Sequence, residues 1–320
     1  MRYRNDSGIP LPVAAFLASD NYDYEDNTVS ATALIKPVRP TILKTRVPES
    51  EQVIDIASLF KARIGTAIHD AIEKTWVEGH YKKALELLGY PSKTINNLNV
   101  NPDGHDWQNA IYLEKRSYKE IDGYLISGKF DLVVNGRVED IKTTSTFTYT
   151  DQSNVQNYRL QGSIYRWLNP EIITNDYMAI QYIFTDYMPA KAYQDNYPPA
   201  PVVEQKIGLL SLPETEAYIR NRLRQIAKYS DKPEEEIPRC TDEELWRKPP
   251  QYKYYKNPDK MTRSTKNFDD LASASRYQME QNGQGVIVTK PGEVVACKYC
   301  PAFSACTQKN EYIADGSLKV

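Results

Sequence analysis

Two short motifs, Gly128-Lys129-Phe130-Asp131 and Asp140-Ile141-Lys142, bring two carboxylates and a lysine near one another in the chain. Between them Asn135-Gly136 joins two apolar runs, a pattern typical of a tight β-hairpin. Adjacent carboxylates repel unless a cation lies between them, and oxygen ligands suit a hard divalent metal. Lys142 lies two residues after Asp140, so both side chains project from the same strand face. The pattern therefore predicts a site that activates water against a phosphate ester, although many such pairs are only solvated strand faces.

Two helices predicted on either side of this hairpin carry further polar pairs. His69 and Glu73 lie four residues apart and share a helix face. An imidazole and a carboxylate so placed can ligate a metal or orient its water, although a single helix histidine is most often structural. Gln161 and Tyr165 share a face of the second helix, where they can hold a phosphate or a base edge.

The chain has four cysteines, all after residue 239. A disulfide framework would be spread more evenly, and a chain of 320 residues does not need one. Four thiolates at one end indicate a metal centre, and zinc and an iron–sulfur cluster both accept four cysteines. One Cys-x2-Cys pair with a distant lone cysteine favours a cluster over zinc. The residues are Cys240, Cys297, Cys300 and Cys306.

In this order, Gly65-x3-His69, Gly128-x2-Asp131, Asp140-x-Lys142 and Gln161-x3-Tyr165 resemble the RecB-type branch of the PD-(D/E)XK nucleases. The cysteine tail resembles that of the iron–sulfur members of this branch, and the chain is most similar to exonuclease-like proteins encoded by bacteriophages. The resemblance covers roughly residues 30–310. It implies an α/β fold, in which a mixed central sheet flanked by helices forms a restriction-endonuclease-like core, with a cysteine-stapled C-terminal region.

The resemblance also implies a role for each residue of the predicted hairpin site. His69, Asp131, Asp140 and the carbonyl of Ile141 would bind Mg2+ or Mn2+. Lys142 would position the attacking water and stabilise charge on the phosphate. The catalytic set is thus His69, Asp131, Asp140 and Lys142.

The same resemblance assigns DNA contact to Gln161 and Tyr165 and a [4Fe–4S] cluster, or alternatively Zn2+, to the four cysteines. In the better-known cluster nucleases the lone cysteine precedes the catalytic core. Here Cys240 follows that core, so the cluster would tie two parts of the C-terminal region.

The segment Arg247–Lys266 is rich in cations and tyrosines. Cations follow a phosphate backbone, and aromatic rings can stack on bases. The alternative is a solvated loop with structural tyrosines, but beside a nuclease core we expect DNA contact. The residues expected to make it are Lys253, Tyr255, Lys256 and Arg263.

The global composition constrains the setting of this site. A net charge of −2 gives the whole chain no attraction for nucleic acid, and 41% hydrophobic residues allow a core. No apolar run approaches the ~20 residues of a membrane-spanning helix, and metal-type cysteines suit a reducing interior. We expect a cytoplasmic protein, in the host cytoplasm if it is phage-encoded. No P-loop motif is present, so any motor would be a helicase partner; a single-strand-binding or annealing protein is another expected partner.

We expect an N-terminal arm over residues 1–29, a nuclease core over 30–230, and a metal-cluster and DNA-contacting region over 231–320. Glu114 can add a further acid to the site, although a solvated strand position is the simpler interpretation. Helices are predicted over 54–78, 154–168 and 213–229, and strands over 110–120, 124–134, 137–143, 177–186 and 202–210.

The predicted function is a divalent-metal-dependent DNA nuclease, taken as an exonuclease of phage DNA recombination, repair or degradation from the family resemblance. One alternative is a nuclease-like fold that binds DNA ends without cutting them, which the intact Asp131, Asp140 and Lys142 set argues against. The other is an interaction protein stabilised by zinc.

Overall fold

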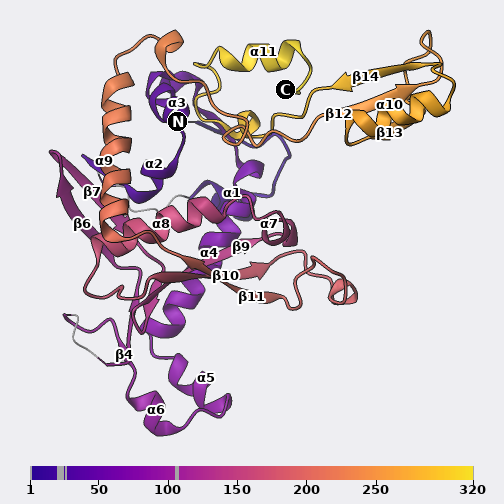
Figure 1. Ribbon diagram of the computed structural model, residues 1–320. Coiled ribbons are helices and arrows are strands. Elements are labelled where there is room, and N and C mark those ends of the chain that lie inside the picture. Colours follow the sequence, from indigo (N-terminus) through magenta and orange to yellow (C-terminus); the bar gives the residue numbers. More distant parts are fainter. Residues whose placement is uncertain (1, 20–24, 26, 105–107, 320) are drawn as a thin grey trace. The chain divides into compact units, whose positions relative to one another are not determined.

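The computed structural model describes residues 2–19, 25, 27–104 and 108–319 (Figure 1). The chain forms two compact units, the first of Met1–Ile35 and Val53–Arg224 and the second of Lys36–Gln52 and Gln225–Val320. Residues 36–52 join the second unit because Val38 and Ile42 share an apolar cluster with Ile237. The domain boundaries predicted from the sequence lie at residues 29 and 230. Residues 20–24 and 26 of the predicted N-terminal arm lie outside the described residues.

The first unit is built on a mixed six-stranded sheet with the strand order β11-β10-β9-β8-β5-β4. Strand β9 is parallel to β10, and β4 is parallel to β5, whereas the other neighbouring pairs are antiparallel. The predicted mixed central sheet is therefore confirmed. Its strands are β4 (Asn99–Val100), β5 (Ala110–Leu113), β8 (Leu132–Val134), β9 (Arg137–Thr144), β10 (Tyr177–Phe184) and β11 (Val202–Gly208).

Helices cover both faces of this sheet. The side chains of β9 alternate between the two faces, so they show which helix packs on each face. Val138 lies in one apolar cluster with Tyr158 of α8 (Val155–Leu168), while Ile141 lies in another against Ile72 of α4 (Phe60–Val77). The first cluster also takes in residues of α2 (Ala31–Ile35) and α9 (Leu212–Tyr229). The flanking helices of the predicted core are thus present on both faces.

Two strands predicted to be continuous are each broken. The run over 110–120 divides into β5 and β6 (Arg116–Ile121), and the run over 124–134 divides into β7 (Tyr124–Lys129) and β8. Strands β6 and β7 form a separate sheet with β2 (Thr28–Ser30). The first break is at Glu114, whose φ is 50°, and its N–H donates to the carbonyl of Asp131 at the second break, at 2.9 Å. Both chain segments therefore change sheets together.

The hairpin between β8 and β9 forms as predicted. Val134 pairs with Arg137 across the turn, in which Asn135 and Gly136 have φ values of 49° and 79°. Both values lie in the left-handed region that a type I′ turn requires.

The helix predicted over 54–78 begins later, at Phe60. Val53–Asp55 forms the short strand β3, and Ile56–Leu59 forms a 3-10 turn. The Asp55 carboxylate accepts the N–H of Ala57 at 3.1 Å, which stabilises a non-helical start. The predictions for α8, α9, β10 and β11 are confirmed to within two residues. The remaining elements of the first unit are β1 (Arg2–Arg4), α1 (Leu11–Ala18), α5 (Tyr81–Leu87), α6 (Ser92–Asn96), α7 (Thr146–Asp151) and a 3-10 turn at Pro189–Lys191.

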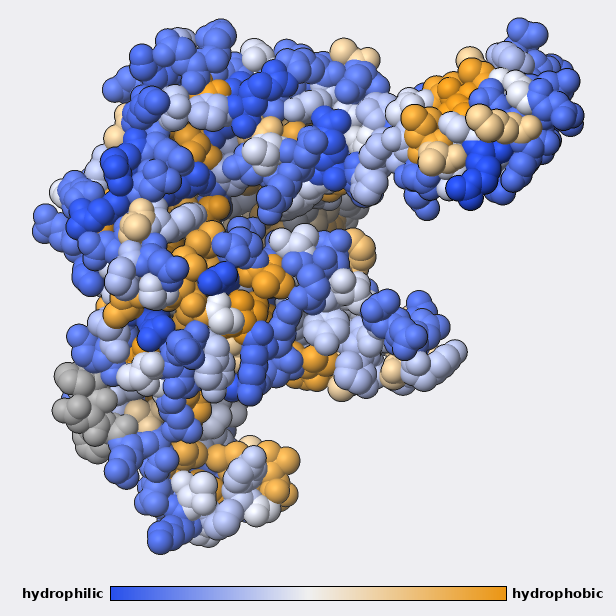
Figure 2. Space-filling view, in the orientation of Figure 1, coloured by the Kyte–Doolittle hydropathy of each residue, from blue (hydrophilic) through white to orange (hydrophobic). Residues whose placement is uncertain are grey.

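The second unit contains a small antiparallel sheet in the order β13-β12-β14, against which α10 packs. Tyr254 and Ala274 form its buried centre, while Figure 2 shows apolar and polar side chains side by side on its surface. Its elements are α3 (Val38–Leu43), β12 (Gln251–Tyr255), β13 (Lys266–Phe268), α10 (Leu271–Glu280), β14 (Val286–Lys290) and α11 (Gln308–Ala314), with 3-10 turns at Lys44–Arg46, Glu49–Glu51, Glu234–Glu236 and Ala296–Tyr299. Across the described residues, none of the helices has the length and apolar character needed to span a membrane.

Candidate active site

The candidate site lies beside the start of β8, where β9 stays paired with β10 on one edge but its pairing with β8 has stopped on the other. Pairing between β8 and β9 stops at Leu132 and Glu139, so the backbone of Ile141 meets side chains instead of a strand on that edge. Its N–H donates to Oδ2 of Asp131 at 2.7 Å. Its carbonyl oxygen lies 2.9 Å from Nε2 of His69. Three of the four groups predicted to bind metal therefore meet at one peptide.

A third acid completes this cluster. His69, Glu114 and Asp131 each offer a ligand atom within 4.8 Å of the other two, and they are the sole such trio among the described residues. Nδ1 of His69 lies 3.6 Å from Oδ2 of Asp131, and the Glu114 side chain is 18% exposed. The interpretation of Glu114 as a solvated strand residue is therefore wrong, because the break after β5 turns the acid toward Asp131.

Asp140 and Lys142 form an ion pair beside this trio. Lys142 Nζ lies 2.6 Å from Oδ2 of Asp140, whose side chain is 2% exposed. The ammonium also lies 5.8 Å from the ring centre of Tyr158 on α8. Burial alone would lower the pKa of Lys142, but the carboxylates of Asp140 and Asp131 outweigh burial and raise that pKa. Lys142 is thus a fixed cation at the site.

The site carries more negative than positive charge. Burial and the Asp140 carboxylate raise the pKa of Asp131 to about 7. Burial and the Glu114 carboxylate likewise raise the pKa of Glu73, and Glu114 also pairs with Lys129 at 2.6 Å. A divalent cation relieves such repulsion, and an imidazole with several carboxylates is a donor set that suits Mg2+ or Mn2+. The carboxylates of Glu73, Glu114, Asp131 and Asp140 outnumber the ammonium groups of Lys129 and Lys142 by two.

The two residues of α8 predicted to contact DNA lie in the core of the first unit. Gln161 is 9% exposed and Tyr165 is 5% exposed. Nε2 of Gln161 donates to the Tyr165 hydroxyl at 2.9 Å, and the Tyr165 ring packs edge-on against Phe130. Tyr165 thus packs α8 against the residue that precedes Asp131, and DNA contact by Gln161 and Tyr165 stays a prediction.

The basic segment is only partly exposed. Lys256 and Arg263 are exposed and Lys253 is half-buried. Tyr255 is 6% exposed, so its ring is not available to stack on a base, contrary to prediction. Its neighbour Tyr254 is buried as well, so both faces of β12 are covered at this end of the strand, which a count of aromatic residues does not reveal.

The four cysteines are half-buried and none forms a disulfide. Burial raises the pKa of Cys240 to about 12, with contributions from Glu244 and from the sulfurs of Cys306 and Cys300. Burial and the same two sulfurs raise the pKa of Cys297 to about 11. The thiols therefore lie near enough to influence one another, yet within the described chain no three of their sulfurs fall within 4.8 Å of one another. The four-cysteine centre remains a prediction.

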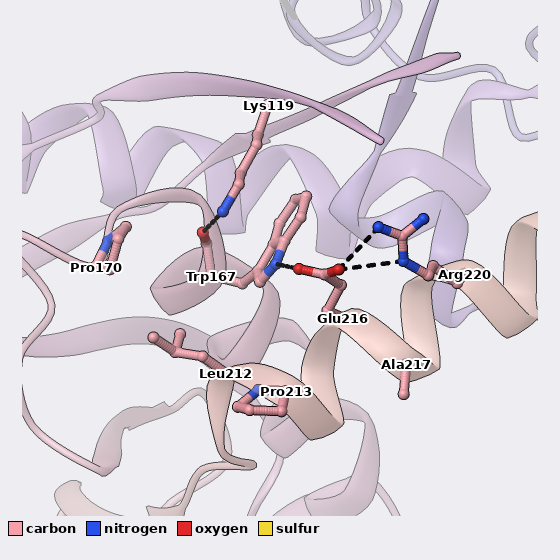
Figure 3. A pocket seen from close by; sticks show the side chains of 8 residues that line it. All are labelled: Lys119, Trp167, Pro170, Leu212, Pro213, Glu216, Ala217 and Arg220. Carbon is pink, nitrogen blue, oxygen red and sulfur yellow. Dashed lines mark hydrogen bonds and ion pairs between the residues drawn. The ribbon is translucent and has the colours of Figure 1, made fainter. Parts of the chain in front are cut away.

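A hollow of about 420 Å3 lies in the first unit apart from the candidate site (Figure 3). Trp167 forms one wall and donates its indole N–H to Glu216 at 3.3 Å, while Lys119 lies 4.2 Å over the Trp167 ring. Glu216 in turn pairs with Arg220 at 2.9 Å. The charged groups of this hollow are thus engaged with its own walls, and the predicted catalytic residues do not line it.

No protein family matches this chain, and no curated protein does. Among solved structures, the chain is similar to the crystal structure of a protein called SSO0001, with 17% identity, a TM-score of 0.39, and 64% of this chain and 78% of that chain covered. It is also similar to a phage-related exonuclease from Haemophilus somnus 129PT, with 15% identity, a TM-score of 0.29, and 64% of this chain and 94% of that chain covered.

Proposed function

We propose that this protein is a divalent-metal-dependent DNA nuclease that hydrolyses phosphodiester bonds, most specifically an exonuclease acting in phage DNA recombination, repair or degradation. One observation carries the proposal. His69, Glu114 and Asp131 gather ligand atoms within 4.8 Å of one another, directly beside the ion pair of Asp140 and Lys142. DNA as the substrate rests on the order of the sequence motifs.

In this proposal the Mg2+ or Mn2+ ligands are His69, Asp131, Asp140 and the Ile141 carbonyl, and Glu114 joins them. A bound divalent ion polarises a phosphate and lowers the pKa of a water molecule. The hydrogen bond from the Ile141 N–H orients Asp131, and the hydrogen bond at the Ile141 carbonyl orients His69.

Lys142 acts on the substrate rather than on the ion. Asp140 holds the Nζ of Lys142 at 2.6 Å. The ammonium group is therefore already positioned beside the carboxylates, and the side chain need not move when the substrate binds. A fixed cation of this kind stabilises the charge that develops on the phosphate oxygens, and it can orient the attacking water. Asp140 therefore has two tasks, as a proposed metal ligand and as the group that positions Lys142.

We extend the proposal to a [4Fe–4S] cluster at Cys240, Cys297, Cys300 and Cys306, with Zn2+ as the alternative. All four cysteines are free, and burial together with the sulfurs of Cys300 and Cys306 raises the pKa values of Cys240 and Cys297. A bound metal would relieve the repulsion among the thiolates. The single Cys-x2-Cys pair with a distant lone cysteine favours the cluster over zinc.

DNA contact outside the active site is assigned to Lys253, Lys256 and Arg263. Two of these three cations are exposed, and phosphate contacts of this kind need no aromatic partner. A helicase or a single-strand-binding or annealing protein is the proposed type of protein partner.

The test is digestion of end-labelled linear and circular DNA, single- and double-stranded, in Mg2+, Mn2+ or EDTA. Asp131→Asn, Asp140→Asn and Lys142→Met should each lower cleavage at least a hundredfold. Glu139→Gln is the matched control, because Glu139 is a buried carboxylate on the same strand that pairs with Arg137 outside the site.

Full activity of Asp140→Asn, or equal cleavage in EDTA and Mn2+, would exclude the proposed mechanism. Retention of DNA ends without cleavage in any metal would instead identify an end-binding protein. Cleavage of linear but not circular DNA is the result expected of an exonuclease.

A further inference from the structure

Arg39 of α3 is a buried cation in the second unit. Its side chain is 5% exposed, and it stands 201 residues before the first cysteine of the chain. Arginine is almost never buried to this degree unless its donors are satisfied. The identity of its acceptors therefore indicates what the residue is for.

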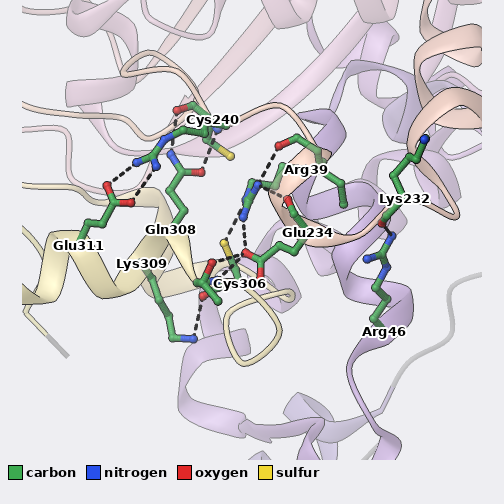
Figure 4. Close-up of polar contacts among 12 residues, drawn as sticks. Arg39, Arg46, Lys232, Glu234, Cys240, Cys306, Gln308, Lys309 and Glu311 are labelled. Atoms are coloured by element: carbon green, nitrogen blue, oxygen red, sulfur yellow. Dashed lines mark hydrogen bonds and ion pairs between the residues drawn. The ribbon is translucent and has the colours of Figure 1, made fainter.

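The guanidinium group has four acceptors, drawn in Figure 4. Nη1 donates to the carbonyl oxygens of Glu234 at 3.2 Å and Ile237 at 3.0 Å, and Nη2 pairs with the Glu234 carboxylate. The remaining acceptor is a sulfur, because Nε donates to Sγ of Cys306 at 3.3 Å. Of these contacts, only the last reaches a residue of the proposed metal centre.

The surroundings hold this contact in place from both sides. The Glu234 carboxylate that pairs with Arg39 also accepts the N–H of Thr307 at 2.6 Å and its hydroxyl at 2.9 Å. Thr307 follows Cys306 directly, so one carboxylate fixes both the donor and the backbone that carries the sulfur. Lys309 adds a second cation, which donates to the Cys306 carbonyl at 2.9 Å.

The choice of a sulfur as acceptor has a chemical meaning. A neutral thiol is a weak acceptor, whereas a thiolate accepts a charge-assisted hydrogen bond from a guanidinium. A metal-bound cysteine is a thiolate. Donors to ligand sulfurs orient the ligand and tune the metal, since they draw electron density from the sulfur.

We propose that Arg39 is a positioning residue of the four-cysteine metal centre, in which it donates a hydrogen bond to the metal-bound sulfur of Cys306. The inference rests on the proposed metal centre. It makes residues 36–52 part of the structure that holds the metal, although they precede every cysteine. Because a cationic donor favours the more negative state of a cluster, loss of Arg39 should make the cluster harder to reduce.

The test compares Arg39→Met with Arg46→Met in anaerobically purified full-length protein. Arg46 is an exposed control on the same segment, because it also ties residues 36–52 to the rest of the second unit, through the carbonyls of Ser230 at 2.9 Å and Lys232 at 2.7 Å. The readouts are iron and zinc content, the visible absorption spectrum and the reduction potential. Arg39→Met should lower the equilibrium constant for one-electron reduction at least tenfold, or about 59 mV, and Arg46→Met should not.

The possible outcomes separate the two proposals. Wild-type protein without iron or zinc would overturn the metal centre itself. Metal-loaded wild type with the same potential in both variants would overturn the role of Arg39 alone. If the wild type holds zinc, the readout becomes release to a chelator, which should be at least tenfold faster in Arg39→Met than in Arg46→Met; equal rates would overturn the role. Should Arg39→Met not fold, Arg39→Lys keeps the charge but loses the Nε donor, and the same shift is expected.

Discussion

Replacement of Asp131 by asparagine should stabilise the metal-free protein, although it should also abolish cleavage. Asparagine has the same shape, and its side-chain oxygen can still accept the Ile141 N–H that Asp131 binds at 2.7 Å. What it removes is a negative charge beside Asp140. Both effects have the same cause. The Asp131 charge binds the metal, but without metal it is repelled by Asp140 and destabilises the folded protein.

The expected gain follows from the pKa of Asp131, which burial and Asp140 raise from 3.8 to about 7. A carboxyl group with a raised pKa holds its proton more tightly when folded, so the stability of the metal-free protein falls as the pH rises from about 4 to about 7. A pKa change of one unit is worth about 1.4 kcal/mol. The raised pKa of Asp131 therefore lowers the free energy of unfolding by roughly 4 kcal/mol at pH 8, where the carboxyl group is ionised. This is an upper value, because the side chain is 18% exposed and salt screens it.

The assay is urea unfolding of wild type, Asp131→Asn and the control Glu139→Gln in EDTA at pH 5 and pH 8. At pH 8 we expect Asp131→Asn to be more stable than wild type by about 2 to 4 kcal/mol. At pH 5 the gain should fall to less than half, and saturating Mn2+ at pH 8 should remove it. A variant less stable than wild type at pH 8, or a gain that does not depend on pH, would refute the reasoning.

Three further outcomes follow from the geometry of the site. Glu114→Gln should weaken Mn2+ binding at least tenfold in calorimetry while Glu139→Gln leaves it unchanged, and equal affinities would remove Glu114 from the ligand set. Lys142→Met should abolish cleavage yet keep Mn2+ affinity within a few-fold of wild type, so a loss of metal binding would contradict its assignment to the substrate. Gln161→Leu should cost about 1 kcal/mol of unfolding free energy, because it removes a buried hydrogen bond to Tyr165; a selective loss of DNA affinity at unchanged stability would instead support a DNA contact.

The parts of the site set by local chemistry are readable from the sequence. Asn135-Gly136 fixes the hairpin because both residues adopt left-handed φ values. Residues two apart on a strand share a face. The placement of Asp140 beside Lys142 on β9 therefore follows from their spacing. The helical spacing around His69 likewise places it on α4, because the apolar face of that helix must pack on the sheet.

The remaining parts depend on contacts between distant segments. The break at Glu114 leaves no signal in the sequence, since β-forming residues continue on both sides of it. It exists because its N–H meets the Asp131 carbonyl, at 2.9 Å in the folded chain. Spacing also cannot tell an exposed helix face from a buried one, so Gln161 and Tyr165 have the pattern of surface residues yet lie in the core. For the same reason, the aromatic content near Tyr255 predicts stacking that burial prevents.

The broken strands explain why the candidate metal ligands meet at this place and not along a regular part of the sheet. In an unbroken ladder the N–H and carbonyl of Ile141 would bind the neighbouring strand, and neither would be open to a side chain. Because β8 begins only at Leu132, those two groups instead orient Asp131 and His69. An interrupted strand lowers the number of backbone hydrogen bonds, and the carboxylates gathered there repel. Both features weaken the fold, as expected where residues are arranged for chemistry rather than for stability.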